Sequence, residues 1–221
     1  MDINKAYQKF TIKINKNATT DSISCDKGRF AIILNESQNK FQEFILDKKG
    51  DDEIRYIQHL LVEDYLISSS NPQKDSQDFP LPKNYFDISS VHAEATKGNC
   101  TKQKIDLFEI KNDDRNNILS DEFNKPSFKY REAPYNLTSN KIKVYKEDFE
   151  IENLVLSYYR YAKQVELQDS EDPESDFKNT SLLEWEDKIA DRIISLTASE
   201  FELNNGSEKY QANKLNSAQK I

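Results

Sequence analysis

Side chains of the types that do chemistry are few in this chain and lie far apart. The two histidines, His59 and His92, have no cysteine near them in the sequence, whereas a structural zinc site needs clustered ligands. Cys100 lies in a Gly-Asn-Cys-Thr turn, and a thiol nucleophile needs a general base and a group that orients it. We interpret Cys25 and Cys100 as buried free thiols. The sequence therefore predicts no catalytic residue, no metal site and no cofactor.

Two groups of carboxylates have the composition of a catalytic or calcium-binding site. Trp185 is flanked by Glu184, Glu186 and Asp187. Paired carboxylates can cleave glycosidic bonds, but we interpret these as the solvated face of a helix. The acidic run 169–176 lacks the spacing and central glycine of a calcium-binding loop, so we interpret it as a solvated loop. The sequence argues against an enzyme, because no acid, base and nucleophile converge.

A basic, tyrosine-rich run is the first candidate for a binding surface. It consists of Tyr158, Tyr159, Arg160 and Tyr161. Tyrosine and arginine are enriched at the energetic centres of protein interfaces. Alternate residues of a strand face opposite sides of a sheet, so we expect half of the run to be core and Arg160 to contribute to a contact with another protein chain. The other candidate interface residues are in the C-terminal tail, which is either disordered or docked on a partner: Tyr210, Leu215 and Ile221.

This run lies in a segment, residues 141–167, whose pattern predicts strands. Apolar and polar residues alternate on both sides of a turn at 146–148, with β-branched and aromatic residues enriched. That pattern is typical of half-buried antiparallel strands. Further extended segments are expected at 88–95, 104–110, 125–131 and 135–138, with one or two helical turns within 113–123. Residues 79–167 are therefore expected to form an antiparallel, sandwich-like β domain.

Helical periodicity precedes the β-rich segment. Apolar residues at helical spacing predict a helix over residues 3–14. A second helix is expected to be capped by Ser24 or Asp26 and to end at Gly50. A third, capped by Asp51 or Asp52, is expected to carry its apolar face as far as Tyr65. The short connection between the second and third helices predicts antiparallel packing.

A further helix follows the β-rich segment. Ser181 and Glu184 form a capping-box pattern, and the helix is expected to run through Trp185 towards Phe201. The sequence thus predicts an α+β fold in which N- and C-terminal helices form an antiparallel bundle, because each needs a partner for its apolar face. The expected parts are an N-terminal helical part at 1–70, a linker at 71–78, the inserted β domain at 79–167, an acidic linker at 168–179, the C-terminal bundle helix at 180–204 and a tail at 205–221.

Composition excludes some classes of function. The chain has 221 residues and a formal net charge of −8, with 36% hydrophobic and 32% charged residues. A general nucleic-acid binder needs an excess of lysine and arginine. No apolar run approaches the length of a bilayer, and we expect no membrane association and no secretory signal. The Asn-X-Ser/Thr sequons are interpreted as a by-product of the asparagine-rich composition.

Two short segments and their order carry a resemblance to a known family. Phe79–Phe86 reads Phe-Pro-Leu-Pro-Lys-Asn-Tyr-Phe, and the apolar segment 151–163 contains Tyr-Tyr-Arg at 158–160. Together with flanking helices, they resemble the head-to-tail connector (adaptor) proteins of tailed phages, the tail tubular protein A type. The asparagine- and lysine-rich style and the segment Arg131–Tyr135 look most similar to the collar ring proteins of crAss-like phages. The family often has proline after Tyr-Tyr-Arg, where this chain has Tyr161 and Ala162.

The resemblance implies a structural virion protein at the head–tail junction, made in the cytoplasm of a bacterial host. It implies a homo-oligomeric ring, typically twelvefold, beneath the portal. The helical bundle would dock on the portal protein, the tail would lie in a portal groove, and the β domain would meet neighbouring ring or tail proteins. DNA would only pass through the lumen.

A second hypothesis is a β-sandwich binding module on a helical stalk, for glycan or tail-fibre attachment. It depends on the tyrosine-rich strand end at 158–161. Glycan binding would separate the two hypotheses, because a connector has no reason to bind glycans.

Overall fold

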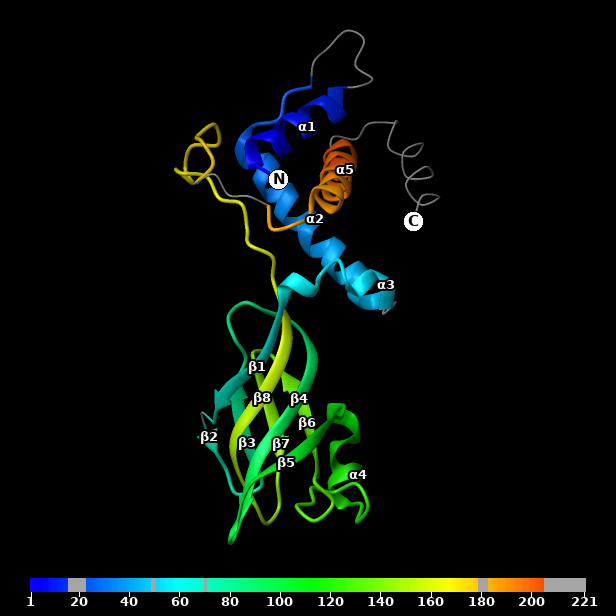
Figure 1. The fold of residues 1–221 in the computed structure, drawn as a ribbon, viewed down its shortest axis with the longest axis vertical. Helices are drawn as coiled ribbons and strands as arrows, with labels where there is room; N and C mark the ends of the chain where they lie inside the picture. The colour runs from blue at the N-terminus through cyan, green and yellow to red at the C-terminus, as the bar shows by residue number, and fades with distance from the viewer. Residues whose placement is uncertain (16–22, 49–50, 70, 179–182, 205–221) are drawn as a thin grey trace. The chain divides into compact units, whose positions relative to one another are not determined.

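The chain folds into helices and one large sheet, which confirms the α+β class. The computed structural model describes residues 1–15, 23–48, 51–69, 71–178 and 183–204 (Figure 1). The chain divides into two compact units: a helical unit of Met1–Ile57 together with Ala162–Ile221, and a β unit of Gln58–Tyr161. The β unit is therefore an insertion between the two segments that form the helical unit.

The helical unit contains α1 (Ile3–Asn15), α2 (Lys27–Lys48), the short α3 (Asp51–Ile54) and α5 (Asp187–Asn204). Both α1 and α2 pack against α5. The aromatic ring of Phe10 lies 4.9 Å from that of Phe30 and 5.6 Å from that of Phe201. These three residues come from α1, α2 and α5, so the apolar face of each helix is covered by the others.

The first two predicted helices are confirmed. Helix α1 buries Ile3, Ala6, Phe10 and Ile14 along one face. Helix α2 begins at one of the two predicted caps, since the N–H of Arg29 donates to Oδ1 of Asp26 at 2.6 Å. This bond satisfies one of the donors that a helix start leaves without a partner.

The described part of the β unit holds a single sheet of eight strands. After a 3-10 turn, η1 (Gln58–Leu60), come β1 (Leu61–Ser68), β2 (Asn71–Pro72), β3 (Ser76–Pro80), β4 (Tyr85–Lys97) and β5 (Cys100–Glu109). Then follow η2 (Asn112–Asp114), α4 (Arg115–Ser120), β6 (Glu132–Thr138), β7 (Lys141–Tyr145) and β8 (Glu150–Arg160). The spatial order is β1-β8-β4-β5-β6-β7-β3-β2. The β5–β6 pair is parallel, whereas the other pairs are antiparallel.

The sheet is curled, so that strands near its two edges meet. Gln77 of β3 is bonded to the backbone of Ile151 in β8: the N–H of Ile151 donates to Oε1 at 2.9 Å, and Nε2 donates to the carbonyl oxygen at 3.0 Å. β8 and β3 are each one strand from an edge, and only a curled sheet can join them. The enclosed face carries the core, with buried apolar residues such as Phe79, Ile105 and Leu156.

The expected third helix is wrong. Only Asp51–Ile54 is helical, and Leu61–Ser68 is strand β1. Asp64 has a positive φ of 50°, and the register with β8 shifts between Val62 and Tyr65. This irregularity interrupts the alternation of apolar and polar residues that a regular strand shows. The remaining apolar spacing therefore matched the pattern expected of a helix. The antiparallel pair of long helices predicted here is therefore absent from the described residues.

The expected linker at 71–78 is also wrong, because it overlaps β2 and β3. Ser76, Gln77 and Asp78 are buried although they are polar. Each side chain has a partner inside the unit: besides the bonds of Gln77, the hydroxyl of Ser76 donates to Oε1 of Gln73 at 3.3 Å, and Oδ2 of Asp78 pairs with Lys141 at 2.6 Å. Composition alone does not distinguish buried polar residues that have hydrogen-bond partners from the solvated polar residues of a linker.

Of the remaining predicted strands and helices, some are confirmed and others are wrong. The strands expected at 88–95, 104–110 and 135–138 are confirmed within β4, β5 and β6, and the helical turns within 113–123 match η2 and α4. The extended segment expected at 125–131 is wrong, since it consists mainly of turns. The last helix begins at Asp187, so Trp185 precedes it, and Ser181 lies outside the described residues. A two-sheet sandwich and an antiparallel bundle are not confirmed.

Candidate functional site

The two segments that carry the resemblance meet at one corner of the β unit. Asn84 stands immediately before β4, and Tyr158 lies near the end of β8. The hydroxyl of Tyr158 donates to Oδ1 of Asn84 at 3.0 Å. The N–H of Tyr161 donates to the carbonyl oxygen of Asn84 at 2.9 Å. We call the group Asn84, Phe86, Tyr158 and Tyr161 the β4–β8 corner.

Aromatic packing completes the β4–β8 corner. The rings of Phe86 and Tyr161 meet edge to face, with centroids 4.7 Å apart and planes at 87°. The ring of Tyr158 is contacted by Tyr65 at 5.9 Å and by Tyr85 at 6.1 Å. The pairs Phe86–Tyr161 and Tyr65–Tyr158 are edge to face, and such pairs are favourable beyond the area that they bury. Burial raises the pKa of Tyr158 above its usual value, so its hydroxyl stays protonated and donates the bond to Asn84.

The tyrosine-rich run divides between core and surface. Tyr158 and Tyr159 are both buried. Burial, and secondarily the charge of Asp87, raises the pKa of Tyr159. Arg160 is half-buried and donates to the carbonyl oxygen of Tyr161 at 3.1 Å. Tyr161 is 40% exposed, so it offers the most accessible side chain of the run. The tail candidates Tyr210, Leu215 and Ile221 lie outside the described residues.

The residues considered for chemistry differ in their surroundings. Cys25 is buried as expected, and burial raises the pKa of its thiol to about 11. Cys100 is exposed, so the expectation of two buried thiols is half wrong. Burial, followed by the charge of Lys104, lowers the pKa of His92. In the described ranges, no three His, Cys, Asp or Glu side chains gather in a way that would hold a metal ion.

The carboxylates around Trp185 act as structural ties. Glu184 accepts a hydrogen bond from the N–H of Lys163 at 2.9 Å. Asp187 lies 3.4 Å from the amino group of Met1. Trp185 is buried, and its Nε1–H donates to Oε1 of Gln38 at 2.7 Å. These contacts join segments at both ends of the chain within the helical unit.

Asparagine side chains also organise the helical unit, which sequence patterns did not indicate. Asn35 of α2 accepts a bond from the N–H of Val165 at 2.9 Å and donates to the carbonyl oxygen of Val165 at 3.0 Å. It also accepts a bond from Nε2 of Gln38 at 3.2 Å. The amide of Asn35 thus bonds both the N–H and the carbonyl group of Val165, as a neighbouring β-strand would. These bonds hold the segment around Val165 against α2.

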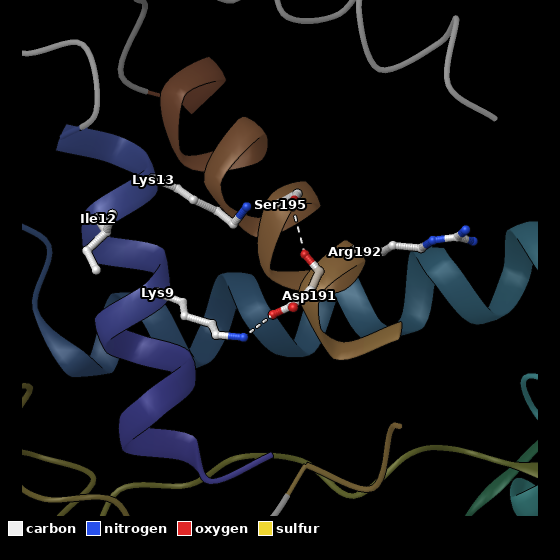
Figure 2. Close-up of a pocket in the computed structure, with 6 residues that line it drawn as sticks. All are labelled: Lys9, Ile12, Lys13, Asp191, Arg192 and Ser195. Carbon is white, nitrogen blue, oxygen red and sulfur yellow. Dashed lines mark hydrogen bonds and ion pairs between the residues drawn. The ribbon is translucent and has the colours of Figure 1, made fainter. Parts of the chain in front are cut away.

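A groove between α1 and α5 is a second feature that sequence reasoning missed. Figure 2 shows its lining, which consists of Lys9, Ile12, Lys13, Asp191, Arg192 and Ser195. Ile12 is 67% exposed. The signal was present in the sequence, because Ile12 lies off the buried stripe of α1 and an isoleucine there is exposed to solvent.

No protein-family model matches this chain, and no curated protein is significantly similar to it. Among the described residues, no helix combines the length and the apolar character needed to cross a membrane.

Proposed function

We propose that this chain is a structural virion protein, a head-to-tail connector that forms a ring beneath the portal. It joins capsid to tail and lets DNA pass through the ring. It is synthesised in the cytoplasm of the bacterial host and resides at the head–tail junction of the virion. It works through repeated interfaces and catalyses no reaction.

The β4–β8 corner is the observation that supports this proposal most. Residues 79–86 and 151–163, which carry the resemblance to connector proteins, are far apart in sequence. Asn84 nevertheless bonds both Tyr158 and Tyr161. Phe86 likewise packs on Tyr161. The two segments thus hold each other in place at this corner, which gives a physical reason for them to occur together.

The organisation of the chain also supports the proposal. Segments from both ends form the helical unit, and the β unit is inserted between them. In this proposal the helical unit is an antiparallel bundle that docks on the portal protein, and the sandwich-like β unit meets a neighbouring ring or tail protein. Copies of the chain contact one another in a closed, typically twelvefold ring. The net charge of −8 would repel the DNA phosphates electrostatically, so that DNA passes through the lumen without binding to it.

Co-sedimentation with assembled portal rings tests the proposal. The full chain is expected to sediment with the portal. A variant that lacks residues 207–221 is expected to keep its far-ultraviolet circular dichroism spectrum and to lose attachment. Attachment by the shortened variant would remove the tail from the docking surface. A full chain that stays in the supernatant while the portal rings are intact would contradict the proposed function.

A second candidate function is a ligand-binding β unit on a helical stalk, for glycan or tail-fibre attachment. Phe123 and Tyr130, in the segment between α4 and β6, are 90% and 68% exposed. Exposed aromatic side chains are large contact surfaces for a ligand. A glycan array probed with the full chain tests this function. Binding that disappears in Phe123→Ala and Tyr130→Ala would favour it over the connector.

A further inference from the structure

The groove between α1 and α5 has a lining that carries a net positive charge. Its volume is about 530 Å³, and its lining holds three cationic side chains and one carboxylate. The carboxylate of Asp191 is already paired with Lys9 at 2.5 Å. In Figure 2, Lys13 extends from α1 towards α5, whereas Ile12 lies on the side of α1 away from α5. The groove therefore suits an acidic segment, although the chain as a whole is negatively charged.

The helical unit also carries such an acidic segment, the loop of residues 166–178. Its ends are joined by backbone bonds, from the N–H of Gln168 to the oxygen of Asp176 at 2.7 Å and from the N–H of Lys178 to the oxygen of Glu166 at 2.8 Å. The carbonyl oxygen of Pro173 accepts a further bond from the N–H of Gly28 at 2.9 Å. We call this segment the acidic loop.

The acidic loop carries carboxylates on turns that are held by hydrogen bonds between side chains and the backbone. Asp169 and Asp172 accept bonds from the backbone N–H groups of Glu171 and Glu174, at 2.9 and 3.0 Å. These four acidic residues are all exposed. Within the described part of the chain, Glu171 and Glu174 form no ion pair with lysine or arginine. Their charges are available to a partner.

The groove and the acidic loop lie on opposite flanks of α1. The ring of Tyr7 faces the loop, 6.1 Å from the ring of Phe177, whereas Lys9 faces α5. Residues two positions apart on a helix point roughly 200° apart. Figure 1 shows the loop, in yellow, and α5, in orange, on either side of α1 and α2. The loop of one molecule therefore faces away from its own groove.

We infer that the α1–α5 groove of one copy binds the acidic loop of a second copy. Two different surfaces then meet, so the contact is heterologous, and its repetition gives a closed ring or an open fibre. The inference deepens the proposed connector function, on which it rests for ring closure, by naming the surfaces through which neighbouring copies meet.

Carbodiimide cross-linking tests the contact, because this reagent joins a carboxylate to a lysine amine that touches it. Equal amounts of ¹⁴N- and ¹⁵N-labelled full-length protein are mixed at millimolar concentration and cross-linked, and the peptides are identified by mass spectrometry. Mixed-isotope peptides that join Lys9 or Lys13 to Glu171 or Glu174 are expected. Their absence would overturn the inference.

Charge reversal sharpens the test. The variant Lys13→Glu with Arg192→Glu is expected to lower the yield of cross-links from Lys9 to Glu171 or Glu174 by at least about tenfold, because like charges would then face each other. The reciprocal variant, Glu171→Lys with Glu174→Lys, has no carboxylate at these two positions and supplies lysines there instead. Mixing the two reversed variants is expected to restore an intermolecular product between the reversed sites. Unchanged yield from Lys9 in Lys13→Glu with Arg192→Glu, or no product between the reversed sites in the mixture, would overturn the inference.

A matched control separates local contact from net charge. Lys83→Glu with Lys111→Glu makes the same change in charge at two exposed lysines of the β unit and is expected to leave the yield unchanged. The outcome is separable from that of the proposed function. Portal attachment without this product would refute only the contact, and the product without portal attachment would refute only the connector function.

Discussion

Asn84 and Tyr158 lie 74 positions apart in the sequence, and the hydroxyl of Tyr158 donates a 3.0 Å hydrogen bond to the side chain of Asn84. The bond joins the start of β4 to the end of β8, the strand pair with the longest register in the sheet. The backbone of Asn84 also accepts from Tyr161. These two bonds therefore hold the last residues of the β unit, at the end of β8, against the residue that precedes β4.

A double-mutant cycle measures the bond between Asn84 and Tyr158. Asn84→Ala and Tyr158→Phe are each expected to lower the free energy of unfolding by about 1 kcal/mol. The double variant is expected to lose less than the sum, with a coupling of roughly 0.5–1 kcal/mol. Urea denaturation followed by circular dichroism gives these values. Asn99→Ala, at an exposed hairpin residue, is the control, and strictly additive losses would refute the coupling.

Removing the amide of Asn35 is expected to destabilise the helical unit. Asn35→Ala loses both bonds to Val165 and the bond from Gln38, which costs about 2–3 kcal/mol. Trp185 is the single tryptophan of the chain and is buried in this unit, so its fluorescence reports the transition. Asn4→Ala, at an exposed residue of α1, is the comparison. Equal midpoints for the two variants would show that the Asn35 bonds contribute nothing.

Alkaline pH is expected to destabilise the β unit. Burial, followed by the charge of Asp87, raises the pKa of Tyr85 to about 12, and burial with the charge of Glu109 raises that of Tyr135 to about 12. The ordinary value is 10.0. The unfolded chain therefore loses these protons first, and the stability present below pH 10 declines as the pH rises towards 12.

Conservative substitutions test this pH dependence. Tyr85→Phe and Tyr135→Phe remove the titrating hydroxyls, so each is expected to make the decline of unfolding free energy between pH 10 and pH 12 shallower. Tyr130→Phe changes an exposed tyrosine and serves as the control. Denaturation at a series of pH values gives the slopes, and slopes that match the control would contradict the assignment.

The two thiols are expected to differ in reactivity. The thiolate is the nucleophile, and Cys25, with a pKa of about 11, holds little thiolate near neutral pH. Cys100 is exposed. Alkylation by iodoacetamide in the folded protein is expected to be at least about a hundredfold slower at Cys25 than at Cys100. Peptide mapping measures both rates, denaturant is expected to equalise them, and equal rates before unfolding would contradict the burial of Cys25.

Strong periodicity allowed parts of the fold to be predicted from the sequence. The stripe of α1 and the capping residue Asp26 of α2 were correct because local spacing and capping determine them. Alternation likewise located β7 and most of β8. The class of fold follows from these elements, since each needs another layer to cover its apolar face.

Elements that depend on distant partners could not be predicted. Strand β1 was hidden by the irregularity at Asp64, and β3 by polar residues that are buried because Gln77 and Asp78 find partners in β8 and β7. The candidate site shows the same limit. Sequence reasoning singled out Tyr158 for an interface, but its hydroxyl bonds Asn84 and its ring is core.

Electron cryo-microscopy of the full-length protein mixed with the portal protein encoded near it tests the central claim most directly. The connector account predicts a closed ring of this chain on the portal, with the helical unit at the portal contact. Particles in which intact portal rings carry no density for this chain would contradict it.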